Sequence, residues 1–155
     1  DGEDDDGDVA HPSSETDVIS VGGVTLKGTI WSGSSRGDNN GRLLPLPILM
    51  PRGDPDKKPE IVAPAEGVPV LLDDGGWGLA DGTSAATVYV TGALCLLLES
   101  KPSLRADEST GGADNINTVK QWLMDSAVPE AGQTTHDDRY GYGLLNVSGL
   151  LQLAA

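Results

Sequence analysis

The stretch DGTSAATVYVTGALCLLL, from Asp81 to Leu98, decides how this sequence folds. It leads from a glycine-rich loop into the most apolar run of the chain and carries no charge after its first residue. A run that is apolar on most faces is typical of a core helix in an α/β protein, and its hydroxyl residues and glycine argue against a membrane span. Lys101-Pro102 ends the run, so we predict a buried helix over residues 83–99.

Ser84 stands in the first turn of this predicted helix, directly after the close turn that Gly82 permits. The N-terminus of a helix presents unpaired N–H groups and the positive end of the helix dipole, which suits a developing oxyanion. Ala85 and Ala86 leave open space in front of the hydroxyl. Ser84 is therefore a candidate nucleophile, and the alternative is that Thr83 or Ser84 simply caps the helix.

Predicted strands and helices alternate along the rest of the chain. Expected strands are Val18 to Val24, Lys58 to Pro64 and Val68 to Leu72; Leu43 to Met50 is expected at an edge or in a surface arm, Asp73 to Gly82 in a loop, and helices over 117–127 and 146–155. This order predicts a three-layer α/β domain with a mainly parallel sheet.

Composition excludes several classes of protein. The 155 residues include 10 Lys plus Arg and 24 Asp plus Glu, for a formal charge of −14. Because phosphates and anionic lipids are bound by clustered basic side chains, we expect neither a nucleic-acid partner nor a membrane partner. Cys95 is the single cysteine, so an internal disulfide is impossible, and we predict that it fills space in the core.

The motifs around Ser84 resemble a known family. Gly82-Thr83-Ser84-Ala85-Ala86, followed by Val90-Thr91-Gly92-Ala93-Leu94, resembles the nucleophile motif of the subtilisin-like serine proteases (subtilase, peptidase S8). Further segments similar to that family follow its order along the chain: Val18 to Val24, the Ser-Ser-Arg-Gly turn within Trp31 to Gly37, Lys58-Pro59-Glu60-Ile61-Val62-Ala63-Pro64, and Tyr140 to Asn146. One motif alone would be weak, but this collinear set is specific.

The resemblance implies a serine-type endopeptidase that works through an acyl-enzyme. Ser84 would be the nucleophile, and its backbone N–H would be one oxyanion donor. The chain would be the C-terminal part of a single three-layer α/β/α peptidase domain over residues 1–155. Its parts would be an acidic loop (1–10), strands and loops (18–72), the nucleophile helix (83–99) and later helices (117–127 and 146–155).

The family's other catalytic groups have no match in this sequence. Only 83 residues precede Ser84, too few for the aspartate and histidine at the family's spacing. His11 and His136 lie in polar loops and are expected to be solvated or to cap a turn. A pair of His136 with Asp137 would mimic other triad orders, but adjacent residues rarely point the same way. Asn39-Asn40 follow the first strand and are expected in a turn, not in an oxyanion hole.

We therefore expect this chain to begin just after the oxyanion asparagine, with the aspartate, histidine and asparagine upstream as its partner. Residues Asp1 to Asp8 hold six acids and would border the primary specificity pocket, where they could favour basic substrate side chains. The alternative is a solvated, variable loop. After Ser84 the family's Met and its Pro-His pair are replaced, with Ala85, Ala86, Thr87 and Val88 at these positions.

The expected partners are a protein or peptide substrate and the upstream part of the same domain. Catalysis needs no cofactor, and although many family members bind structural calcium, no site can be located because Asp4 to Asp8 do not fit an EF-hand. The family implies secretion. Two alternatives stay open: a non-catalytic α/β interaction module that kept the fold, and an esterase-like hydrolase, for which the Gly-x-Ser-x-Gly elbow is lacking. Substrate sequence and oligomeric state are beyond this sequence.

Overall fold

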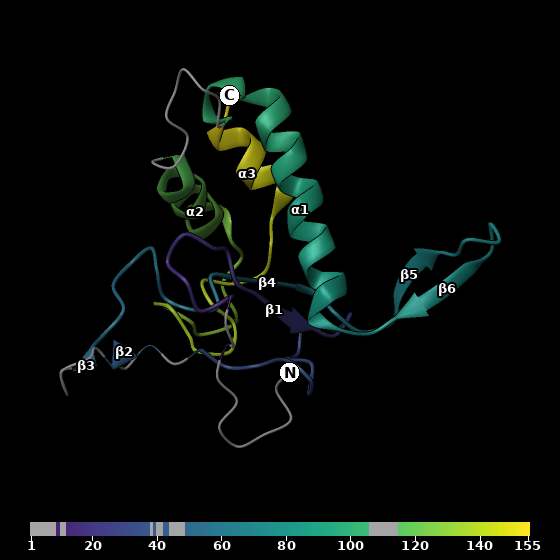
Figure 1. Cartoon of the computed structure of the whole chain (residues 1–155), viewed down its shortest axis with the longest axis horizontal. Coiled ribbons are helices and arrows are strands. Elements are labelled where there is room, and N and C mark those ends of the chain that lie inside the picture. The colour runs from purple at the N-terminus through teal and green to yellow at the C-terminus, as the bar shows by residue number, and fades with distance from the viewer. Residues whose placement is uncertain (1–8, 10–11, 38, 40–41, 44–48, 106–114) are drawn as a thin grey trace.

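The computed structural model describes residues 9, 12–37, 39, 42–43, 49–105 and 115–155 (Figure 1). The acidic segment from Asp1 to Asp8, His11 and Asn40 lie outside the described residues, so the predictions made for them are not tested.

A parallel pair of strands forms the centre of the described structure. β1 (Val21–Val24) pairs with β4 (Ile61–Pro64), with Val21 opposite Ile61. On the far edge of β4, the Val62 N–H donates to Gly143 O at 3.0 Å, and the Leu145 N–H donates to Val62 O at 2.9 Å. β4 therefore lies between two neighbours. Among the described residues, the outer side of β1 is met by a turn and not by a strand: the Trp31 N–H donates to Gly23 O at 3.0 Å. Both predicted strands are confirmed, each shorter than its apolar run.

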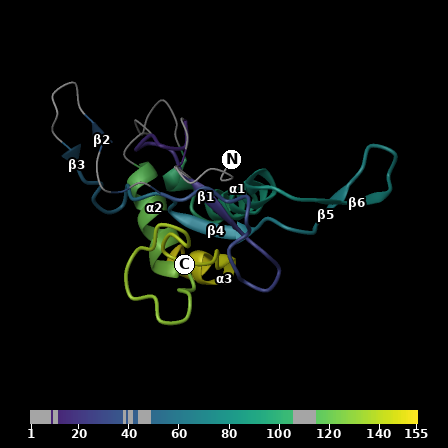
Figure 2. The same ribbon diagram turned by 90° about the horizontal axis from the view of Figure 1, so that it is seen from below.

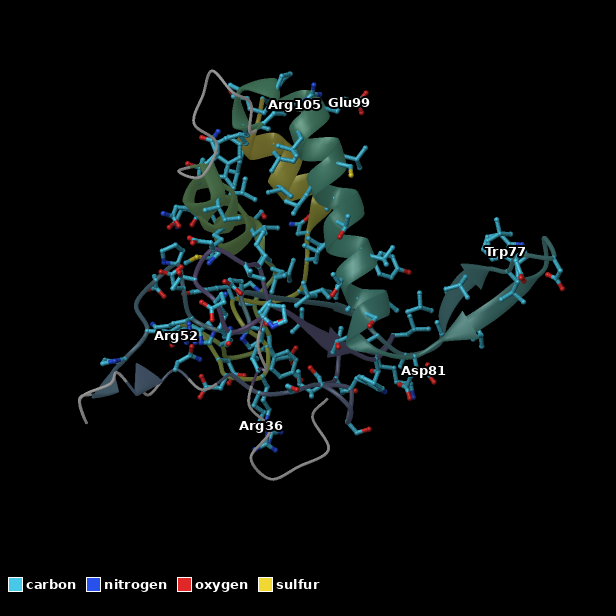
Figure 3. The ribbon with its side chains drawn as sticks, viewed as in Figure 1. Arg36, Arg52, Trp77, Asp81, Glu99 and Arg105 are labelled. Carbon is cyan, nitrogen blue, oxygen red and sulfur yellow. The ribbon has the colours of Figure 1, made fainter. Side chains whose placement is uncertain are left out.

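Two antiparallel ribbons extend from this centre. β2 (Arg42–Leu43) pairs with β3 (Leu49–Met50), so the two described ends of the segment predicted at an edge or in a surface arm form a short ribbon; residues 44–48 lie outside the described residues. β5 (Val68–Leu71) pairs with β6 (Trp77–Ala80) in a hairpin that projects away from the helices (Figures 1 and 2). The prediction of a loop over residues 73–82 was wrong in its second half. Gly75 and Gly76 lie in the hairpin turn. The short apolar pattern of β6 is hard to recognise in the sequence because glycines stand before, within and after it.

α1 (Thr83–Ser100) packs against the parallel strands through Ala86 and Val90, and against α2 and α3 through Ala93 and Leu97. All four side chains are buried. Its opposite face is open, and Val88, Tyr89 and Leu96 are 70%, 42% and 48% exposed. The prediction of a fully buried helix is therefore wrong for one of its faces. By length and composition alone α1 is also apolar enough to cross a membrane, contrary to the sequence argument, and 22% of it is buried.

The remaining helices pack behind α1. A short 3-10 helix, η1 (Pro102–Leu104), follows α1, and then come α2 (Asn115–Ser126) and α3 (Val147–Leu153). Leu97, Leu123 and Leu150, one from each α-helix, meet in a single apolar cluster. Asn146 caps α3, its side chain accepting a hydrogen bond from the Gly149 N–H at 3.0 Å. Both predicted C-terminal helices are confirmed within two or three residues.

The described chain is an α/β structure in which the helices stand on one side of the β1–β4 pair (Figure 1). Within the described residues the sheet pairs are one parallel and two antiparallel, and α1 packs on the parallel pair.

Candidate active site

The turn into α1 is fixed by Gly82. Its φ of 140° lies in a region that side chains rarely adopt, and it is the N-cap residue of the helix with no side-chain capping bond. The Gly82 N–H donates to Ala65 O at 2.7 Å, which ties the turn to the end of β4. The first helical bond runs from the Ala85 N–H to Gly82 O at 3.0 Å. Glycine is thus required where the loop becomes the helix.

Ser84 is the second residue of α1, and its side chain is exposed. Because Gly82 holds the N-cap position and no side chain caps the helix, the alternative that Thr83 or Ser84 serves as the cap is wrong. Thr83 and Ser84 precede the first helical N–H donor, so their backbone N–H groups are among those that an α-helix leaves unpaired. The hydroxyl and an N–H donor of Ser84 therefore stand together at the positive end of an 18-residue helix.

A hollow of about 260 Å³ opens beside this helix N-terminus. Its lining joins Thr83 to the strand residues Ser20, Val21 and Gly22, and to Pro59 at the entry to β4. Further hydroxyl side chains line it from the 12–13 and 34–35 segments. Space for a ligand thus adjoins the candidate nucleophile, between β1 and the loops around it.

The His136 side chain is buried and hydrogen-bonded. Its side chain is 3% exposed, its Nε2 lies 2.9 Å from Pro59 O, and its ring meets the Tyr142 ring edge-on at 4.9 Å. Burial lowers the pKa of the imidazole, against the opposing effects of Pro59 O and Asp138. Its acidic neighbour is Asp138, 3.8 Å from Nδ1, while Asp137 accepts from the Arg139 and Tyr140 N–H groups.

The expectation of a solvated or capping His136 was therefore wrong, and the His136–Asp137 pair does not form. All the contacts that hold the imidazole belong to the 54–60 and 136–142 segments, and none belongs to α1. Close by, the Tyr142 hydroxyl donates to Asp54, which lowers the pKa of that carboxyl. His136 therefore packs beside Pro59, at the entry to β4. The described residues offer Ser84 no histidine as a base.

Sequence reasoning missed a buried charge cluster. Lys58 and Lys120 both contact Glu60 Oε1, at 2.6 and 3.0 Å, and the three side chains are at most 1% exposed. Burial lowers the pKa of the Lys58 ammonium, against the opposing effect of Glu60. Lys120 lies on the otherwise apolar face of α2 beside Val119 and Leu123, and a lysine at that position was the one signal that could have revealed the cluster.

Two further predictions concern single residues. Cys95 is exposed on the open face of α1, so the prediction that it fills the core was wrong. Asn39 was predicted in a turn; its side chain accepts from the Lys58 N–H at 2.7 Å and donates to Lys58 O at 2.8 Å. The Asn39 side chain is thus bonded to the backbone at the residue where the chain enters β4.

Among the described residues no three His, Cys, Asp or Glu side chains gather to hold a metal ion.

An exposed serine at the start of a long helix, after a glycine turn that is bonded to the end of a parallel strand, is an arrangement that hydrolases acting through a serine can use. Comparison with known sequences makes the class specific: the profile described as the Subtilase family matches residues 1–143. The chain belongs to the subtilase family of serine peptidases.

Known relatives agree with this assignment. The chain is 30% identical over 135 residues to a subtilisin-like protease of Arabidopsis thaliana, SBT6.1, a match that covers 87% of this chain and 12% of the plant protein. The solved structure of the patellamide maturation protease PatA is 26% identical with a TM-score of 0.66, covering 96% of this chain and 48% of that one. The CspB protease of Clostridium perfringens, at 23% identity and a TM-score of 0.68, shares the fold over 94% of this chain and 28% of that one. The chain thus spans less than half of each of these relatives.

Proposed function

We propose that this chain carries the nucleophile part of a serine endopeptidase domain, with Ser84 as the nucleophile. The observation that carries the proposal is the placement of Ser84: its exposed hydroxyl stands at the second position of α1, free of any capping role. Within the described residues no hydrogen bond engages this hydroxyl, so it is available to a base and a substrate.

In the reaction, Ser84 Oγ attacks the carbonyl carbon of a substrate peptide bond while a histidine takes the hydroxyl proton. The negative charge then grows on the carbonyl oxygen, where the Ser84 backbone N–H and the positive end of α1 stabilise it. The same proton passes to the departing amine, and water releases the acyl group from Ser84. This chain supplies the nucleophile and one oxyanion donor. The histidine, its aspartate and the oxyanion asparagine are proposed to come from the upstream part of the domain.

The open face of α1 supports a proposed partner of this kind. Val88, Tyr89 and Leu96 expose large apolar surfaces on the helix that carries Ser84. Burying each such side chain fully stabilises a structure by roughly 1.5–3 kcal/mol. β1 also has a partly open outer edge: Ser20 O and Val24 O accept from the β4 side, so Val21 and Gly23 point their backbone groups to the other side. There the described residues pair Gly23 with the Trp31 N–H and Ser34 Oγ but provide no backbone partner for Val21. A partner that adds a strand beside Val21 and covers α1 would pair these backbone groups and bury the exposed apolar side chains.

The proposal is tested by peptide hydrolysis with the complete natural gene product that contains this chain. We expect Ser84→Ala to abolish hydrolysis, with a loss on the order of 10⁶-fold in kcat when compared with the intact enzyme. Ser148→Ala is the matched control, because Ser148 is an exposed serine at the second position of α3. Hydrolysis that survives Ser84→Ala would contradict the proposal.

The isolated chain separates the proposal from its alternative. Without a base the isolated chain is expected to show no turnover. If the complete gene product is also inactive and still binds a protein partner, the chain is a non-catalytic interaction module of the same fold. Secretion follows from the family resemblance alone and stays a prediction.

A further inference from the structure

The buried charges beneath β1 connect three parts of the chain. Lys58 leads into β4, and its ammonium donates to Val18 O and to Glu60 Oε1. Lys120 reaches in from α2, and its ammonium donates to Thr16 O and lies 3.0 Å from Glu60 Oε1. The cluster therefore binds the segment that precedes β1 to β4 and to α2.

Both oxygens of Glu60 are used. Oε1 accepts from the Lys58 ammonium and forms an ion pair with Lys120 at 3.0 Å, and Oε2 accepts from the Ser20 N–H at 2.8 Å. Asp56 contacts Lys120 at 3.0 Å and keeps a third of its side chain in solvent. Two ammoniums thus meet two carboxylates, and the described residues contain no buried side-chain nitrogen or oxygen without a hydrogen-bond partner.

Stability does not explain such an arrangement. Removing a buried ion pair entirely, with apolar groups of similar volume in its place, is often neutral or stabilising by about 1–4 kcal/mol. Charged side chains differ from apolar ones in that their hydrogen bonds are directional. Each ammonium here fixes the position of one particular carbonyl oxygen. Here the fixed carbonyls are Thr16 O and Val18 O, and the fixed N–H is that of Ser20.

These fixed groups belong to the chain segment that lines the hollow beside α1. Pro12 and Ser13 precede the anchored carbonyls, Ser20 and Val21 follow them, and all four line the hollow. Pro59, between Lys58 and Glu60, lines it as well. One wall of the space next to Ser84 is therefore held in position from behind by the cluster.

We propose that Lys58, Glu60 and Lys120 are positioning residues for substrate selection: they set the place of the 12–22 wall and thereby decide which substrate side chain the hollow beside Ser84 accepts. The inference rests on the proposed peptidase function. It assigns no chemical step to the cluster, so it predicts an effect on KM and on selectivity rather than on the acyl-transfer step.

The test uses the complete gene product and a panel of peptides varied at the residue before the cleaved bond. In Lys120→Met, Glu60 keeps Lys58 and Asp56 can turn to solvent, but Thr16 O loses its donor. We expect KM for the best peptide to rise roughly 10- to 100-fold, with kcat within about 3-fold and with the preference among peptides largely lost. Lys27→Met, at an exposed lysine, is the control and should change neither quantity.

A second variant guards against a folding defect. The triple change Lys58→Met, Glu60→Leu and Lys120→Met removes all three buried charges at similar volume, so it is expected to fold and to show the same loss of preference. Labelling of Ser84 by a fluorophosphonate reports separately on the proposed function. If the wild type is not labelled, the proposed function fails and this inference fails with it. If labelling persists and both variants keep the wild-type KM and preference, or if neither variant folds, the cluster does not position the wall.

Discussion

A methyl group placed on Gly37 would stand 1.5 Å from the carbonyl oxygen of Lys58. The two backbones lie this close because Asn39 pairs with the Lys58 backbone and the Gly37 N–H donates to Asp138 O at 2.7 Å. The turn that follows Trp31 is thereby held against the Lys58 backbone at the entry to β4.

Gly37→Ala is expected to destabilise the fold by about 3 kcal/mol or more, because backbone must move away from backbone. Gly53→Ala is the matched control, since a methyl group there meets no atom within 4 Å, and it should stay within about 0.5 kcal/mol of the wild type. Urea unfolding of the chain measures both. Equal stabilities of the two variants would show that the contact is not tight.

The buried His136 predicts a pH dependence of stability. Burial lowers the pKa of the folded imidazole from its ordinary value of 6.5, so the unfolded chain takes up a proton first as the pH falls. The stabilising contribution is therefore complete above the ordinary pKa and is lost progressively as the pH falls toward the lowered folded value. Asp54, Asp138 and Lys57 are the charged groups that act on this ring.

His136→Gln is expected to remove this part of the pH dependence. Urea unfolding of wild type and variant at several pH values between neutral and mildly acidic measures the difference between them, in which the other titrations largely cancel. The difference should shrink on acidification below the ordinary histidine pKa. A difference that is constant with pH would mean that the imidazole titrates alike in the folded and unfolded chain.

Cys95 reports on the open face of α1. It follows Val88 along the same stripe of the helix, next to Leu96, and is exposed in the described structure. If the upstream part of the domain covers this face, maleimide labelling of Cys95 in the complete gene product should be slower than in the isolated chain by on the order of 100-fold, which corresponds to a local opening free energy of about 3 kcal/mol.

The labelling control moves the thiol to another helix. In the variant Cys95→Ser with Ser148→Cys, the new thiol sits at an exposed position of α3 and should react equally fast in both proteins. Equal labelling rates at Cys95 in the two proteins would contradict the proposal that a partner covers α1.

The position of α1 could be predicted from sequence because its signals are local. A glycine turn, an apolar run and Lys101-Pro102 set its bounds, and the structure places α1 from Thr83 to Ser100. The exposure of Cys95 and Leu96 could not be predicted, since an apolar helix that is half open has the same composition as one that is buried. What covers such a face is decided by residues elsewhere.

The surroundings of the site were harder to predict because they depend on tertiary contacts. His136 stands in a polar stretch, which suggests solvent, yet the chain folds back so that Pro59 and Tyr142 enclose its ring. For Lys120, the residue type suggests a surface position, but α2 packs over Glu60 and buries its side chain. Pro59 lies 77 residues from His136, and Glu60 lies 60 residues from Lys120, a separation at which local patterns carry no information.

The most direct test of the account is the site at which a fluorophosphonate attaches to the complete natural gene product, mapped by peptide mass spectrometry. We predict one adduct on Ser84, formed in the wild type and in Ser148→Ala and absent from Ser84→Ala and from the isolated chain. An adduct on any other residue, or unchanged labelling after Ser84→Ala, would contradict the assignment of Ser84 as the nucleophile.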